Sequence, residues 1–326
     1  MKNQETDKPA VGQPTRSRWL KPLAWLLVAA VVGELALRVT GMGNPPLYEK
    51  TDYGYRVQPN QHMTRFGAAV NYNAYGMRGA EFDATPAKNS LRILCVGDSV
   101  TNGGVQTADN NTYPAQLQAT LRQRGKPAET ITAAYGGWGI ANELGWIKTN
   151  GLFGSRVVIF QVERRNLFLP SAPASTVGSS EAFPEHRPML AWQELLTRYV
   201  APRLGLVRTH DPDSTGAGED LGLVPSNIAA LKEMIVLARS GGAFPIVLYT
   251  EEQVHDRPRR PDIEPVQTQL FDALHKLDVP VVRPSIIFEA KGDREMFRPG
   301  DGRHPNTMGY GIIAQEVDRV LVQAGF

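Results

Sequence analysis

The chain has 326 residues, and its 35 basic and 33 acidic residues leave a formal net charge of only +2. So weak a charge argues against a nucleic-acid-binding protein, which needs a basic face to displace counterions from phosphates. A content of 42% hydrophobic and 21% charged residues argues against disorder over the whole length. The single cysteine, Cys95, excludes an internal disulfide framework and a thiolate zinc cluster. A globular enzyme or binding module remains.

The N-terminal region consists of a basic tail, residues 1–22, followed by an apolar run, Leu23–Val39. The run contains Glu34 and Arg38, whose spacing allows them to pair on one helix face. No small-x-small cleavage site follows its fully apolar part, so residues 23–40 are predicted to be an uncleaved transmembrane anchor. A cleaved signal peptide and a buried core helix are the alternatives.

The distribution of charge around this run predicts its orientation. Five basic residues and two acidic residues precede Leu23, namely Lys2, Lys8, Arg16, Arg18 and Lys21 against Glu5 and Asp7. The positive-inside rule therefore places the N-terminus in the cytoplasm and the chain after residue 40 on the other side of the membrane.

Two kinds of sequence pattern follow the apolar run. Residues 41–90 are rich in Tyr, Asn and Gly, which predicts short irregular strands and turns. From residue 91 onward, short apolar runs alternate with amphipathic stretches. The predicted strands are Leu91–Val96, Thr130–Ala134, Arg156–Val162, Phe244–Thr250 and Val279–Val282. The predicted helices are Tyr113–Arg124, Asn142–Lys148, Asn227–Ser240, Val266–Leu277 and Met308–Ala324.

Strands that are apolar throughout and alternate with helices are typical of a parallel sheet covered on both faces. Residues 91–326 are therefore predicted to form a three-layer α/β/α sandwich around a parallel sheet of about five strands. Residues 170–222 do not fit the alternation and are predicted to be an insertion with one helix near Leu190–Val200. This insertion is either a lid that contacts the substrate or a disordered surface loop.

Ligands of such sheets bind beyond the carboxyl ends of the strands, so the residues after each strand are the candidates for chemistry. A Gly-Asp-Ser segment ending in Ser99 follows the first strand. A serine hydroxyl needs a base, and Asp301 and His304 precede the last helix on one predicted loop, where Asp301 can orient the imidazole. The glycine-rich segment after the second strand, Gly136–Gly139, can supply backbone N–H groups to an oxyanion.

Each of these motifs alone has an ordinary structural explanation. The Gly-Asp-Ser segment can be a polar strand-to-helix turn with a helix cap, and His304 can be a surface-loop histidine. The placement of all three segments beside strand or helix ends, in the right order, favours a Ser-His-Asp triad.

This constellation resembles the SGNH, or GDSL-like, hydrolase superfamily over about residues 50–326. The segment Gly97–Gly103 matches the family's first block, Gly137 matches its second and Asp301–Asn306 matches its fifth. Three upstream segments, ELALR, RVQPN and NAYGMRG, are similar to a membrane-anchored bacterial branch of the family. The resemblance implies the flavodoxin-like SGNH fold.

The resemblance also implies the role of each site residue. Ser99 would be the nucleophile, His304 the base and Asp301 the group that orients His304. The N–H groups of Ser99 and Gly137 would hold the oxyanion. No metal or organic cofactor would be required.

The third block departs from the family's Gly-x-Asn-Asp pattern. The chain has Glu163, Arg164, Arg165 and Asn166 at this place, similar to SGNH-like acetyltransferases of exopolysaccharide systems. Asn166 is the nearest amide and is predicted as the third oxyanion donor. Arg165 is the alternative, because a simple register places it where the asparagine belongs and a guanidinium can also hold an oxyanion. Ion pairs at the surface are another role for these arginines.

The resemblance implies a serine esterase or O-acyltransferase in a bacterial inner membrane, with its catalytic part in the periplasm. Its expected substrate is an O-acylated, chiefly O-acetylated, envelope or secreted polysaccharide, and its expected partners are the membrane and polysaccharide synthesis or secretion machinery. The altered third block keeps a second hypothesis open, a catalytically weak glycan-binding or scaffold subunit of such machinery.

Other polar and aromatic residues are weaker candidates. Cys95 lies inside a strand and is predicted to be a buried, unreactive thiol. Tyr135 and Trp138 are predicted to pack either beside the site or in the core. A polar cluster after the fourth strand matches no zinc spacing and is predicted to lie at the rim of the cleft; it comprises Glu251, Glu252, His255 and Asp256.

Overall fold

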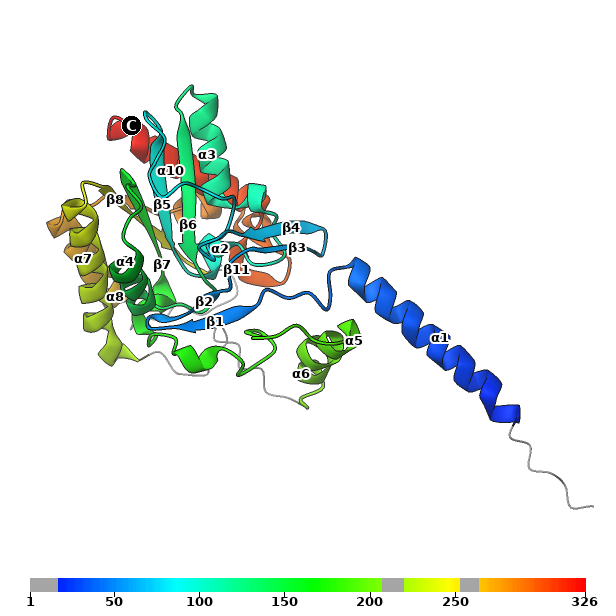
Figure 1. The fold of residues 1–326 in the computed structure, drawn as a ribbon. Coiled ribbons are helices and arrows are strands. Elements are labelled where there is room, and N and C mark those ends of the chain that lie inside the picture. Colours follow the sequence, from blue (N-terminus) through cyan, green and yellow to red (C-terminus); the bar gives the residue numbers. More distant parts are fainter. Residues whose placement is uncertain (1–16, 207–219, 253–263) are drawn as a thin grey trace, which may run out of the picture.

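Five apolar segments form an all-parallel sheet at the centre of the chain in the computed structural model, which describes residues 17–206, 220–252 and 264–326 (Figure 1). The strands are β5 (Leu91–Gly97), β6 (Ala128–Ala134), β7 (Val157–Glu163), β8 (Phe244–Thr250) and β9 (Val281–Val282). Their order is β6-β5-β7-β8-β9. All five predicted strands are confirmed, with bounds that differ by at most two residues.

Alternate side chains of each strand point to opposite faces of the sheet, and helices cover both faces. Ile93 and Cys95 of β5 share a core with two helices, α3 (Tyr113–Gln123) and α10 (Thr307–Gln323). Leu94 and Val96 share the other core with α4 (Ile140–Asn150), α7 (Val224–Ser240) and α8 (Glu264–Lys276). The predicted three-layer sandwich and its helices are confirmed.

The order of the strands fixes where a ligand site can form. Along the chain, β6 lies on one side of β5, whereas β7, β8 and β9 lie on the other. The chain therefore leaves β5 toward β6 and leaves β7 toward β8, in opposite directions along the sheet. A crevice opens at this point, beyond the carboxyl ends of β5 and β7. Ser99 follows β5, and Asn166 follows β7.

The segment before the sheet consists of two antiparallel hairpins, as its turn-rich sequence predicts. They are β1 (Tyr48–Thr51) with β2 (Gly54–Val57) and β3 (Gln61–Arg65) with β4 (Ala68–Tyr72). Buried residues of both hairpins belong to the core that contains α4 and α7. Arg78 forms bridges to both Tyr72 and Thr132, and so joins the second hairpin to the edge strand β6.

The prediction that Asp301 and His304 lie on a loop before the last helix is wrong in one respect, because these residues belong to a short β-hairpin. Strand β10 (Phe297–Arg298) pairs with β11 (Asp301–Pro305), after the short helix α9 (Ser285–Lys291). Gly300 has φ +74° and closes the turn in a conformation that other residues adopt only with strain. The hairpin is too short and too polar to produce an alternating apolar pattern.

The insertion within residues 170–222 folds over the sheet's carboxyl edge. It contains α5 (Ala191–Glu194), a π-helical turn (Leu195–Val200) and α6 (Ala201–Arg203), so the helix predicted near Leu190–Val200 is confirmed. Val177 and Phe183 of the insertion are buried in the core. The described part of the insertion is therefore ordered, and residues 207–219 lie outside the described residues.

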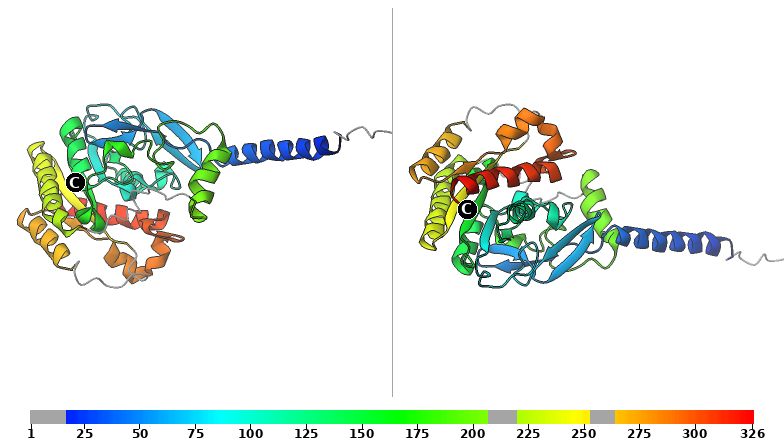
Figure 2. Two further views of the ribbon diagram at one scale, coloured as in Figure 1. Left: turned by 90° about the horizontal axis from the view of Figure 1, so that it is seen from below. Right: turned by 90° about the horizontal axis from the view of Figure 1, so that it is seen from above.

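Helix α1 (Ser17–Val39) projects from the rest of the structure (Figure 1, Figure 2). Among the described residues, two helices are long and apolar enough to cross a membrane. One is Leu20–Val39 within α1, none of which is buried, and the other contains α7, which packs on the sheet. The alternative of a buried core helix for α1 is wrong, and a membrane anchor and a signal sequence both fit it.

A buried ion pair joins the end of α1 to the insertion. Arg65 of β3 and Glu194 of α5 are both almost fully buried and are paired. Arg65 also donates to the Gly41 carbonyl oxygen at 2.8 Å, and Glu194 accepts from the Gly43 N–H at 2.7 Å. The chain leaving α1 is thus fixed to both the second hairpin and the insertion.

Substitution Glu194→Ala is predicted to lower the free energy of unfolding by about 3–5 kcal/mol, because it leaves the Arg65 guanidinium buried without a counter-charge. The measurement is denaturant unfolding of the full chain in detergent. The matched control is Arg65→Met with Glu194→Leu, which removes both charges and is expected to cost less than Glu194→Ala, because only the backbone groups of Gly41 and Gly43 lose their partners. Equal midpoints for wild type and Glu194→Ala would contradict the burial of this pair.

Candidate active site

Ser99 lies in a tight turn at the carboxyl end of β5. Asp98 caps the short helix α2 (Ser99–Asn102), since its Oδ1 accepts from the Val100 N–H at 2.9 Å. Gly97 is required before this turn, because a Cβ atom there would lie 2.5 Å from side-chain oxygens of Gln161 and Thr101. The turn places the serine at the crevice beyond β5 and β7.

The hydroxyl of Ser99, the imidazole of His304 and the carboxylate of Asp301 form one hydrogen-bonded series. His304 Nε2 lies 2.8 Å from Ser99 Oγ, and His304 Nδ1 lies 2.7 Å from Asp301 Oδ2. Asp301 Oδ1 accepts the backbone N–H of His304 at 3.2 Å. With the proton on Nδ1 facing Asp301, Nε2 is the acceptor for the serine proton. The structure brings together the three residues predicted as a triad.

The environment of Asp301 keeps its carboxyl group ionised. Burial alone would raise the pKa of Asp301, but the hydrogen bond and charge of His304 outweigh burial and hold the pKa below its usual value. A carboxylate that stays charged at neutral pH stabilises the imidazolium formed when His304 takes a proton.

The glycine-rich loop after β6 lies against Ser99. A Cβ atom on Gly136 would be 3.7 Å from Ser99 Cβ, and Gly137 has φ +81°, a conformation that favours glycine. Neither the Ser99 N–H nor the Gly137 N–H donates to another residue in the described part of the chain. These two backbone donors are therefore not engaged elsewhere among the described residues, and the oxyanion role of Ser99 and Gly137 stays a prediction.

Asn166 connects the loops that follow three neighbouring strands. It lies in the 3-10 helix Arg164–Phe168 after β7, and its Oδ1 accepts from the Glu163 N–H at 2.6 Å. Its Nδ2 donates to Asp98 Oδ2 at 3.2 Å and to the Trp138 carbonyl oxygen at 3.4 Å. The role of third oxyanion donor stays a prediction for Asn166, because its amide would have to give up one of these bonds.

The carboxyl group of Asp98 is buried at the centre of these loops. Burial raises its pKa, and hydrogen bonds from Val100 and Asn166 together with the charges of His304 and Arg165 act in the opposite direction. Arg165 is half-buried and close enough to influence Asp98. Its alternative role at the oxyanion also stays a prediction.

The altered third block forms ion pairs with the strand that carries His304. Arg303 Nε lies 2.9 Å from Glu163 Oε1, and both side chains are largely buried. Arg164 and Arg303 each lie 3.7 Å from the Glu252 carboxylate. Arg164 therefore takes the ion-pair role, in a partly buried setting. Sequence reasoning missed Arg303, and its only signal was an unexplained positive charge next to His304.

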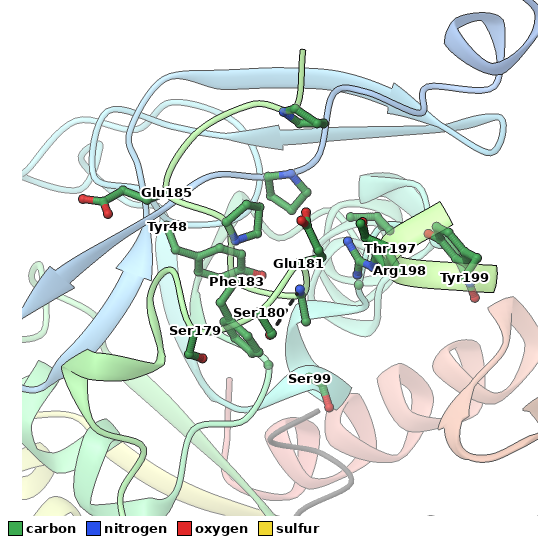
Figure 3. A pocket seen from close by; sticks show the side chains of 18 of the residues that line it. Tyr48, Ser99, Ser179, Ser180, Glu181, Phe183, Glu185, Thr197, Arg198 and Tyr199 are labelled. Carbon is green, nitrogen blue, oxygen red and sulfur yellow. Dashed lines mark hydrogen bonds between the residues drawn. The ribbon is translucent and has the colours of Figure 1, made fainter. Parts of the chain in front are cut away.

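An open cavity of about 1030 Å³ adjoins the triad (Figure 3). Ser99, Asp301 and His304 line one side of it, and residues 178–188 and 197–199 of the insertion line another. Tyr48 of β1 and Phe183 pack together at its wall, with ring centroids 4.9 Å apart. The insertion thus forms part of the cavity, and its contact with a substrate stays a prediction.

The remaining predicted candidates lie outside the triad. Tyr135 and Trp138 are fully buried in the core, where their polar atoms donate to backbone carbonyl oxygens. Within the described residues, no group of three His, Cys, Asp or Glu side chains is placed to hold a metal ion. Glu251 bonds to Gln267 at 2.9 Å, and His255 and Asp256 lie outside the described residues.

Substitution Asn166→Asp is predicted to lower kcat/KM for an ester substrate by roughly 10²-fold, because two adjacent carboxylates repel and the three loops shift. The matched test adds Asp98→Asn, which lets an amide at position 98 donate to the carboxylate at position 166. The double variant is expected to recover part of the activity. An Asn166→Asp enzyme with wild-type kinetics would show that this bond does not position the loops.

Comparison with known proteins gives remote structural similarities only. No family model and no curated protein matches the chain. An acetyl xylan esterase, AlAXEase, is 15% identical and aligns with a TM-score of 0.48, covering 71% of this chain and 100% of its own. LAE5, an alpha/beta hydrolase enzyme from the metagenome of Lake Arreo, is 14% identical with a TM-score of 0.46, covering 70% and 93%. A GDSL-family lipolytic protein from Veillonella parvula is 14% identical with a TM-score of 0.42, covering 71% and 98%. The catalytic interpretation depends on the geometry of Ser99, His304 and Asp301.

Proposed function

We propose that the chain is a serine-dependent esterase or O-acyltransferase. The observation that carries this proposal is the hydrogen-bonded series from Ser99 through His304 to Asp301 at the wall of an open cavity. A serine with a base at 2.8 Å and two unused backbone donors beside it has the parts that acyl transfer needs.

The reaction proceeds in two steps on this geometry. In the first, His304 Nε2 takes the proton of Ser99 as its Oγ attacks the ester carbonyl, and the Ser99 and Gly137 N–H groups hold the oxyanion. The C–O bond to the alcohol breaks, and His304 returns the proton to that alcohol. In the second step, His304 deprotonates water or a sugar hydroxyl as its oxygen attacks the acyl carbonyl. The bond from that carbonyl to Ser99 Oγ breaks, His304 returns the proton to Oγ, and the free acid or the acylated sugar is released.

The proposed substrate is an O-acetyl group on an envelope or secreted polysaccharide outside the cytoplasm. Polar side chains and aromatic rings line a cavity large enough for a sugar unit; they include Tyr48, Glu181, Phe183, Arg187 and Gln193. The apolar helix α1 after a basic tail supports anchoring with the catalytic part beyond the cytoplasmic membrane.

Substitution Ser99→Ala is predicted to lower turnover of a chromogenic acetyl ester by about 10⁴-fold or more in the full-length chain in detergent, because the nucleophile is lost. Ser179→Ala is the matched control, since Ser179 also lines the cavity and its hydroxyl donates to the Thr176 carbonyl oxygen at 2.7 Å, away from the triad. It is expected to keep wild-type turnover.

The same assay separates the remaining hypotheses. Addition of an oligosaccharide acceptor and detection of the acetylated sugar distinguishes a transferase from a hydrolase that releases acetate. A wild-type chain that binds oligosaccharide without turning over any ester would favour the glycan-binding or scaffold subunit and contradict the enzyme proposal.

Substitution Asp301→Asn is predicted to lower kcat by about 10²–10⁴-fold, because an amide no longer holds His304 in the accepting tautomer or stabilises the imidazolium.

Because the pKa of Asp301 is held below 3.8, its bond to His304 stabilises the fold above pH 3.8, and this contribution disappears as the pH falls through the lowered pKa. Unfolding midpoints of wild type and variant are therefore expected to differ at pH 7 and to converge below pH 3.8. A constant difference down to the most acid condition would contradict this assignment.

A further inference from the structure

We propose that residues 189–206, here called the juxtamembrane segment, rest on the lipid surface as a second membrane contact beside α1. The proposal requires the proposed anchoring by α1 and goes beyond the catalytic function. The segment comprises α5, the π-helical turn and α6, and it lies beside the end of α1 from which the chain enters the hairpins (Figure 1, Figure 2).

Direct contacts attach the segment to the apolar helix. The Glu34 carboxylate of α1 accepts the N–H groups of Ala191 and Trp192 at 2.9 and 3.1 Å, as well as Arg38 Nε at 2.7 Å. Trp192 Nε1 donates to the Ala30 carbonyl oxygen at 3.0 Å. A carboxylate within a membrane span is costly unless it is paired, and the segment supplies two of the partners of Glu34.

The position of these contacts along α1 places the segment at the membrane. Ala30 lies nine residues before Val39, which corresponds to about 13 Å along a helix. The 20 residues Leu20–Val39 match the roughly 30 Å thickness of a hydrocarbon core. If this span crosses a bilayer, Glu34 lies five residues, or about 7.5 Å, before its end and holds the backbone of the segment within the interface. The Trp192 ring extends from there toward the hydrocarbon, to the level of Ala30.

The segment exposes large apolar side chains on the surface next to α1. Met189 is 87% exposed and Leu206 is 73% exposed, and Leu190, Leu196 and Leu204 are each more than half exposed. Clusters of exposed apolar side chains of this kind mark a contact with a protein or a membrane. Phe66, at the tip of the second hairpin, extends the patch, since its ring lies edge-on to Tyr199 at 6.4 Å.

The charges of the segment favour anionic lipid over a second protein chain. The segment contains two arginines, Arg198 and Arg203, and one acidic residue, Glu194, and Arg187 lies just before it. Glu194 is buried against Arg65 and also lies 3.9 Å from Arg198. Basic side chains interleaved with exposed leucines are typical of helices that lie in a membrane interface.

The contact has a consequence for access to the catalytic serine. Thr197, Arg198 and Tyr199 of the segment line the same cavity as Ser99 (Figure 3). If the segment rests on lipid, this side of the cavity lies at the headgroup level. An acyl group or glycan presented at the membrane surface then approaches Ser99 without leaving that surface.

The test measures the depth of single labelled cysteines in the full-length chain, reconstituted into vesicles of phosphatidylethanolamine and phosphatidylglycerol. Cys95 is fully buried, and burial raises the pKa of its thiol to about 12, so it does not compete for a maleimide fluorophore. Labels are introduced by Met189→Cys and Leu204→Cys. Val322→Cys on α10 is the control for an exposed apolar site away from α1, and Leu27→Cys reports on insertion of α1 itself.

The labels at positions 189 and 204 are expected to lose about half of their fluorescence to a nitroxide carried on the lipid acyl chains, because an interfacial helix lies about 5–10 Å into the headgroup boundary. The label at position 322 is expected to keep its fluorescence. Quenching at position 27 without quenching at 189 and 204 overturns the second contact and leaves the anchor intact. No quenching at position 27 overturns both. A label at 189 that is shielded from water but unaffected by the nitroxide indicates a protein partner and also overturns the proposal.

Discussion

The hydrogen bond between the Asn166 amide and the Asp98 carboxylate is the interaction on which the geometry of the site depends. In a parallel sheet, the loops that follow β5, β6 and β7 all lie at one edge, but the sheet does not fix their positions relative to each other. Asp98 caps the turn that holds Ser99, and Asn166 also contacts the Trp138 carbonyl oxygen in the loop that carries Gly137. Because both groups are buried, neither can exchange its partner for water without a large cost. This contact therefore helps to hold the nucleophile and the glycine loop together, alongside the Asn102 amide of the same turn, which donates to the Ala134 carbonyl oxygen at 2.8 Å.

The base reaches this edge by a different route. His304 lies on β11, a strand of a separate two-stranded hairpin, so the sheet alone does not place it. Arg303, the residue before it, pairs with Glu163 at the end of β7. A salt bridge between largely buried groups is geometrically specific even where its net contribution to stability is small. Glu163 and Arg303 thus connect the strand of His304 to the sheet.

Features that depend on a local sequence pattern could be predicted from the sequence. Pairings between residues far apart in the sequence could not. The strands were predictable because both faces of β5, β7 and β8 are buried and most of their positions are apolar. Ser99, Asp301 and His304 were predictable because strand ends and helix starts mark the sheet edge. The β10–β11 hairpin could not be predicted, because its two residue pairs are too few to produce the alternating apolar pattern of a strand. The pairing of Arg65 with Glu194 has no local signal, because the two residues are 129 positions apart.

The pairing of Arg65 with Glu194 also determines how the site sits relative to α1. A flexible connection after Val39 would let the cavity take any height above a membrane. Instead, Gly41 and Gly43 bond to Arg65 and Glu194, and Glu194 belongs to the same insertion that lines the cavity. The path from α1 to the wall beside Ser99 therefore consists of buried polar contacts rather than a free linker. On the proposed topology, the fold itself sets the distance between the catalytic serine and the lipid surface. The fold therefore also determines how far from the membrane a substrate can lie and still contact Ser99.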